Sequence, residues 1–230
     1  MLFFTLAGCS GAPSRAPPVV IDDPALTQAL GGLLCRVEPE CEQLRLQVLD
    51  RPFEQAEMFP DGRLLVSIGL LLATHDEAEV AFVLAHETAH RRLRHRIGIS
   101  PTARTRLELE ADADAVRALL EADLRADAGL FLLERLLLKA NEARSRGSRV
   151  AGSEQAKARE FSRVKLQEEA LTQIQARVDA LRALAANSAS DRLPVTADWQ
   201  HLLAPYRISG DQPKADGPAS PLPQNPPSDL

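Results

Sequence analysis

The stretch His86-Glu87-Thr88-Ala89-His90 places two histidines four residues apart, with a glutamate directly after the first. In an α-helix, residues four apart lie on one face, so the imidazoles of His86 and His90 would point at one position in space. Imidazole nitrogen is a favoured ligand of zinc, and a catalytic zinc site keeps three protein ligands and one open position. The stretch therefore predicts two ligands of a zinc ion, with Glu87 facing the open position.

The sequence around this stretch predicts that it is helical and partly buried. Asp76 is a favourable N-cap, and Glu79 follows it at the spacing of a capping box. From Val80 onward the next residues are largely apolar, which indicates that the first half of the helix is buried. We expect this metal helix to run from Asp76 to Arg94.

The third metal ligand is predicted on the next helix, which we expect over residues 105–121. Glu108 and Asp112 share one face of that helix. The first carboxylate could coordinate the ion while the second accepts the remaining N–H of a ligating histidine and so fixes its tautomer. Glu110 and Asp114 have the same spacing. The spacing alone therefore leaves Glu110 open as the alternative third ligand.

A small sheet is predicted directly before the metal helix. Residues 44–48 alternate between apolar and polar, residues 53–59 form a second extended run, and residues 60–62 (Pro-Asp-Gly) mark a tight turn before a third strand at 63–67. These features predict a small antiparallel β-meander. Together with the helices they predict an α+β fold that is mostly α.

Composition limits the class of protein and its domain organisation. The chain has 230 residues, of which 45% are hydrophobic, enough for one buried core. Its formal charge of -5 argues against a nucleic-acid partner, which would require a basic surface. We expect a metal-binding core over residues 23–140, an extension over 141–206 that contains a long helix at 154–186, and a Pro-rich disordered tail over 207–230.

The beginning of the chain resembles a bacterial lipoprotein signal peptide. A short apolar run leads into Leu6-Ala7-Gly8-Cys9, which is similar to a lipobox, although the basic residues that normally precede it are missing. We attribute this to a start codon upstream. The resemblance implies that segment 1–9 is a signal segment, that Cys9 carries the lipid, and that residues 10–22 form a tether. The protein would then be anchored in the bacterial cell envelope, at the outer membrane and facing the periplasm.

The envelope location gives the remaining two cysteines an interpretation. In an oxidising compartment, two cysteines close in sequence tend to form a bridge. We therefore predict a disulfide between Cys35 and Cys41.

The metal motifs carry a resemblance to a known family. His86-Glu87-x-x-His90 followed by Glu108-x-x-Ala111-Asp112, with the upstream run 59–71, is similar to the HtpX and CAAX-prenyl-endopeptidase family of zinc metallopeptidases, whose periplasmic BepA-like members are nearest in layout. The resemblance covers about residues 42–140. It implies a zincin-type (gluzincin) core that holds one Zn²⁺ per chain. The ligands would be His86, His90 and Glu108, with Glu87 as general base and Asp112 in support, which favours Glu108 over Glu110.

The same resemblance implies a function. We expect a zinc-dependent endopeptidase that acts on polypeptides, such as unfolded or misassembled envelope proteins, through a metal-activated water and the base Glu87. The strand at 63–67 is expected to line the cleft and pair with an extended substrate. The alternative is a lipid-anchored zinc-binding module, chaperone-like or used for interaction, with little proteolytic activity. The sequence leaves the oligomeric state open.

Three further residues are candidates for auxiliary roles. Family members often carry a His-Pro pair after the core, whereas this chain has Leu193-Pro194, so His201 and Tyr206 become candidates for stabilising the oxyanion. His95 lies five residues beyond His90, about 140° around a continuous helix. That angle predicts a packing or hydrogen-bonding role for His95 and excludes it as a primary ligand.

Overall fold

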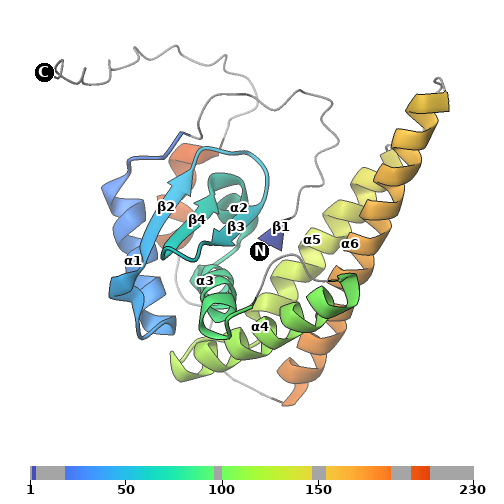
Figure 1. Cartoon of the computed structure of the whole chain (residues 1–230). Coiled ribbons are helices and arrows are strands. Elements are labelled where there is room, and N and C mark those ends of the chain that lie inside the picture. The colour runs from blue at the N-terminus through green and yellow to red at the C-terminus, as the bar shows by residue number, and fades with distance from the viewer. Residues whose placement is uncertain (1, 4–18, 96–99, 147–153, 188–197, 208–230) are drawn as a thin grey trace, which may run out of the picture.

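The computed structural model describes residues 2–3, 19–95, 100–146, 154–187 and 198–207 (Figure 1). A small β-sheet lies beside a group of helices, and helix α3 contacts both the sheet and the helices α1, α4 and α5. The elements in chain order are β1 (Leu2–Phe3), α1 (Pro24–Val37), the 3-10 helix η1 (Cys41–Gln43), β2 (Arg45–Leu49), β3 (Gln55–Met58), β4 (Arg63–Ser67), α2 (Ile68–Ala73), α3 (Glu77–Arg92), α4 (Pro101–Glu121), α5 (Ala128–Arg146), α6 (Glu154–Asn187), α7 (Asp198–Leu202) and the 3-10 helix η2 (Ala204–Tyr206).

The sheet is mixed, with the strand order β1-β3-β4-β2. Strands β3 and β4 form the predicted hairpin, but β2 pairs with β4 in parallel, from Arg45 beside Arg63 to Leu49 beside Ser67. The predicted antiparallel meander is therefore wrong for β2. The link 50–54 is long enough to span the roughly 10 Å between strands that are not neighbours, so β4 fits between β2 and β3. The mostly α, α+β character is as expected.

Helix α3 begins where the sequence predicts. The Asp76 side chain accepts the N–H of Glu79 at 3.0 Å, and the Glu79 carboxylate accepts the N–H of His75 at 2.8 Å. Every residue from Ala78 to Ala89 is buried, which makes α3 the central helix of the core. It ends at Arg92, earlier than expected, because the backbone turns at Arg94 into the left-handed region with φ 55°.

The remaining helices pack around α3. Helix α4 starts four residues earlier than predicted, because Ser100 caps it and Pro101 occupies a first-turn position that suits proline. The sequence placed the end of the core at residue 140, but helix α5 continues without a break to Arg146. It approaches α3 closely at Gly129, where an added Cβ would lie 2.3 Å from the Phe82 ring. The predicted apolar stripe of α6 packs into the same core through Ile174, Val178 and Leu181.

The expected lipid anchor and disordered tail concern residues that the structure does not describe. Cys9, residues 10–18 of the expected tether and the tail from residue 208 onward lie outside the described residues. Within the described part of the chain, no helix combines the length and the apolar character needed to cross a bilayer.

Candidate metal centre

Three side chains from α3 and α4 converge on one position. The Nε2 atoms of His86 and His90 lie 3.1 Å apart. The Glu108 carboxylate lies 3.4 Å from the first and 3.7 Å from the second. Four ligand atoms about 2.0 to 2.1 Å from a tetrahedral zinc ion would be spaced about 3.3 Å from one another. The three groups can therefore hold a metal ion of this kind with little rearrangement, and they form the one cluster of potential ligands in the described residues.

Asp112 orients the first histidine. Its Oδ1 lies 2.9 Å from the Nδ1 of His86, one turn along α4 from Glu108. An ionised carboxylate only accepts hydrogen bonds, so His86 donates its Nδ1–H, which leaves Nε2 to face the cluster. The sequence placed Glu108 and Asp112 on one helical face, and in the structure both reach His86.

Arg177 of α6 is a site residue that sequence reasoning did not identify. Its guanidinium donates to both oxygens of Asp112, through Nε at 2.8 Å and Nη2 at 2.7 Å, and Nη1 lies 3.2 Å from the Glu108 carboxylate. Arg177 is buried. The available signal was its position within the apolar stripe of α6, three residues after Ile174 and beside Val178. A cation in a buried stripe requires a buried anion as partner.

These contacts set the charges of the site. Burial alone would raise the pKa of the Asp112 carboxyl, but the charge of Arg177 and the bond from His86 hold it below its usual range. Burial would also raise the pKa of Glu108. The bond from His86 and the charge of Arg177 outweigh burial, and they lower that pKa. Both carboxylates are therefore ionised at neutral pH, as metal binding requires.

The two histidines have opposite proton affinities in the metal-free protein. Burial and then the charge of His86 lower the pKa of His90 to about 2. For His86, burial and Arg177 act against the charge, but Asp112 and Glu108 outweigh them and raise its pKa. His86 is therefore the more basic of the two in the metal-free protein. A metal ion would compete with protons for its Nε2, because both histidines must bind the ion in their neutral form.

The carboxylate of Glu87, the predicted general base, is bound by strand β3. It is fully buried beside His86, and its Oε2 accepts the backbone N–H of Met58 at 3.1 Å. Met58 is the last residue of β3, so the sheet holds the carboxylate. Burial, and then the negative charge of Glu87, raises the pKa of the nearby Glu57 on the same strand.

His95 and Glu110 form a second pair next to the cluster. The Nδ1 atoms of His95 and His90 lie 2.8 Å apart, and the Nε2 of His95 lies 3.4 Å from Glu110. The predicted angle of about 140° between His90 and His95 is wrong, because it assumed a helix that continues through residue 95. The hydrogen-bonding role expected for His95 agrees with its position. Glu110, the alternative third ligand, faces His95 and lies outside the cluster.

Residues 39–103 match the sequence profile of peptidase family M48. The matched segment contains the sheet strands β2 to β4 and the whole of α3, including His86, Glu87 and His90. The match supports an M48 metallopeptidase. The matched segment ends before Glu108, whose place in the cluster rests on its distances to the two histidines. No curated protein is detectably similar to the chain.

The oxyanion candidates His201 and Tyr206 occupy a different part of the molecule. The Tyr206 hydroxyl donates to Asp23 at 2.6 Å, at the N-terminus of α1, and His201 is exposed on α7. Trp199 of α7 donates to Thr74, twelve positions before His86. Helix α3 begins only at Glu77, nine residues before His86, which is roughly 14 Å along a helix. The structure gives neither candidate a contact with the cluster, and their oxyanion role stays a prediction.

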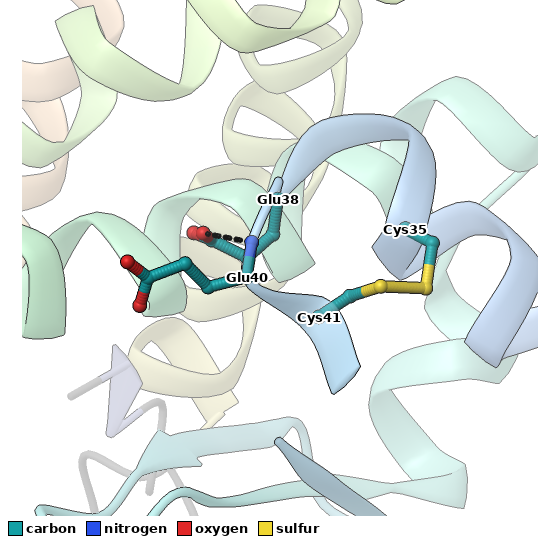
Figure 2. The surroundings of a disulfide bond; sticks show 4 residues. All are labelled: Cys35, Glu38, Glu40 and Cys41. Atoms are coloured by element: carbon teal, nitrogen blue, oxygen red, sulfur yellow. Dashed lines mark hydrogen bonds between the residues drawn. A yellow bond between two sulfur atoms is a disulfide. The ribbon is translucent and has the colours of Figure 1, made fainter. Parts of the chain in front are cut away.

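Cys35 and Cys41 form a disulfide that closes the loop after α1, with an S–S distance of 2.02 Å. In Figure 2 the loop carries Glu38 and Glu40, and the Glu38 carboxylate accepts the N–H of Glu40. Glu38 also binds Arg92 of α3 at 2.6 Å. The loop is therefore attached to the C-terminal end of the metal helix.

Replacing Arg177 by methionine should destabilise the metal-free protein by about 3 to 5 kcal/mol, because Asp112 and Glu108 would stay buried without their cation. Urea denaturation in the presence of a chelator measures this change. The matched control is Arg182→Met on the same helix, where an exposed ion pair with Glu134 is lost. Its effect should be small. Equal effects of the two substitutions would contradict the role assigned to Arg177.

The single tyrosine should titrate at unusually high pH. Burial and the bond to Asp23 raise the pKa of Tyr206 to about 12. Because the raised value favours the neutral phenol in the folded state, its contribution to stability is complete below pH 10 and is lost as the pH rises toward 12. Absorbance at 295 nm follows the phenolate directly. Asp23→Asn keeps a helix-capping side chain and should move the midpoint toward 10; a wild-type midpoint near 10 would contradict the contact.

Proposed function

We propose that the chain is a zinc-dependent endopeptidase in which His86, His90 and Glu108 hold the ion and Glu87 is the general base. The observation that carries the proposal is the spacing of the three ligand groups around one point, together with the Glu87 carboxylate, which follows His86 on α3 and is bound by β3. The M48 match supports the metallopeptidase class. A bound zinc ion would polarise the scissile carbonyl and lower the pKa of its water toward ~7.

The remaining steps are proton transfer and the positioning of side chains, which residues of the chain carry out. Glu87 takes a proton from the attacking water and returns it to the amine that leaves, so no covalent intermediate with the protein is needed. The N–H of Met58 holds the Glu87 carboxylate in one position while it does so. Asp112 holds His86, and Arg177 holds Asp112, which keeps the ligand in place during proton transfer.

The substrate is proposed to lie along β3, not along the strand 63–67 that the sequence suggested. Strand β4 lies between β3 and β2, so it offers no edge. The N–H of Met58 points away from β4 toward Glu87, and β1 pairs antiparallel with β3 on that same edge. An extended polypeptide added to this edge would pass Glu87. Main-chain pairing of this kind suits unfolded proteins as substrates.

The proposed location is the bacterial cell envelope, through a lipid on Cys9 at the outer membrane. This proposal rests on the lipobox-like sequence, as does the suggestion that the substrates are unfolded or misassembled envelope proteins, in the manner of HtpX-like and BepA-like peptidases. Fractionation of bacterial cells that produce the protein from its own gene should find it in the membrane fraction, and Cys9→Ser in the soluble fraction. Identical fractionation of both forms would contradict the lipid anchor.

The catalytic assignment is tested with Glu87→Gln. The variant should bind one zinc ion per chain and cleave an unfolded protein such as reduced casein at least ~100-fold more slowly, because the general base is lost. Glu108→Gln should lose zinc, whereas Glu110→Gln should retain it. Zinc content and cleavage rate are measured on the same preparations.

Three outcomes would contradict parts of this proposal. Equal cleavage by wild type and Glu87→Gln would remove Glu87 as the base. Loss of zinc from Glu110→Gln but not from Glu108→Gln would reverse the choice of ligand. Stoichiometric zinc with a stable polypeptide complex and no cleavage by the wild type would favour the zinc-binding interaction module.

A further inference from the structure

Each histidine of the cluster has a partner at its other ring nitrogen. The Nδ1 of His86 lies against Asp112, as the sequence anticipated. The Nδ1 of His90 lies 2.8 Å from the Nδ1 of His95, a residue with no role in the proposed chemistry. Partners at this position fix the tautomer and the ring orientation of a ligating histidine. His95 therefore occupies, for His90, the position that Asp112 occupies for His86.

The backbone is shaped to bring His95 to this place. After α3 ends, the N–H of His95 donates to the carbonyl of His90 at 2.9 Å, and the N–H of Arg94 donates to that of Arg91 at 3.1 Å. These two bonds define a Schellman motif, which requires a left-handed residue, here Arg94 with φ 55°. Glycine normally takes that position, since a residue with a Cβ is strained there. The turn folds the chain back so that His95 packs on His90.

The proton positions along this contact are determined by chemistry. If Nε2 of His90 is to face the metal, its Nδ1 must carry the hydrogen and donate it. His95 must then accept at Nδ1 and carry its own hydrogen on Nε2. That Nε2 is buried, has no well-aligned hydrogen-bond partner in the described structure, and has its nearest carboxylate, Glu110, at 3.4 Å. The His95 side chain is only 6% exposed, whereas that of Glu110 is 49% exposed.

We propose that His95 is a positioning residue for the metal ligand His90, accepting its Nδ1–H, with Glu110 orienting His95 in turn. The inference rests on the zinc site of the proposed function. It assigns Glu110 a function different from metal ligation. It also gives the strained turn at Arg94 a function, because a continued helix would carry residue 95 away from His90.

The test compares two replacements of His95. In His95→Asn the Oδ1 atom occupies nearly the same place as Nδ1, so an acceptor for His90 remains, whereas His95→Leu fills the space without an acceptor. Zinc affinity, measured by competition with a chromophoric chelator, should fall about 10- to 100-fold in His95→Leu and only a few-fold in His95→Asn. The visible spectrum of the cobalt-substituted protein should change in the same order. His75→Leu, at an exposed loop histidine, is the matched control and should change neither.

A second readout does not need the metal. In the metal-free protein, the ¹⁵N shifts of the His90 ring should report the Nδ1–H tautomer in wild type and in His95→Asn, and a mixture of tautomers in His95→Leu. Equal losses of zinc affinity in both variants would show that His95 only packs, and unchanged affinity and tautomer in His95→Leu would overturn the proposal. If wild type binds no zinc, the proposed function fails, while the ring shifts still decide whether His95 orients His90.

Discussion

The site depends on the buried ion pairs of the Arg177 guanidinium with Asp112 and Glu108. Helix α4 brings Glu108 and Asp112 into the interior, Glu87 of α3 is also buried, and the charges of all three act on Arg177. Three carboxylates cannot be removed from water without compensating positive charge. Arg177 supplies one charge and a bound zinc ion would supply two, which balances the three carboxylates. Helix α6 is therefore part of the site, although it lies in the segment that the sequence assigned to an extension.

The metal helix is held at both ends by charged contacts with other helices. At its N-terminus, Glu79 is buried and paired with Arg125, which lies just before α5, and with Arg135 of α5. At its C-terminus, Arg92 lies between Glu38 of the disulfide loop and Asp114 of α4. The second contact ties the helix that carries the histidines to the helix that carries Glu108. A metal site made from two helices needs such a link, because small shifts between the helices would separate the ligand atoms.

The features that sequence could predict are those fixed by local geometry. His86 and His90 share a face in any regular helix, as do Glu108 and Asp112, and Asp76 caps α3 because its side chain reaches only the next turn. The choice between Glu108 and Glu110 depends on how α3 packs on α4, and spacing cannot give that. Arg177 was missed because it lies 65 residues after its partner Asp112, on another helix. The pairing of β2 with β4 was missed because alternation identifies strands and not their neighbours. The turn at Arg94 was missed because it lacks the glycine that usually marks the end of a helix.

The position of β3 links the geometry of the site to the kind of substrate proposed for it. One edge of β3 is bonded to β4, and along the other lie Glu87 and the two-residue strand β1. A polypeptide can use that second edge only if its own N–H and C=O groups are unpaired, because strand addition consists of main-chain hydrogen bonds. In a folded protein, these backbone groups are already hydrogen-bonded. In the proposed lipoprotein, β1 belongs to the signal segment removed before Cys9, so this edge of β3 would be open to a substrate. The proposed site therefore selects for unfolded chains through its backbone, before any side-chain pocket contributes.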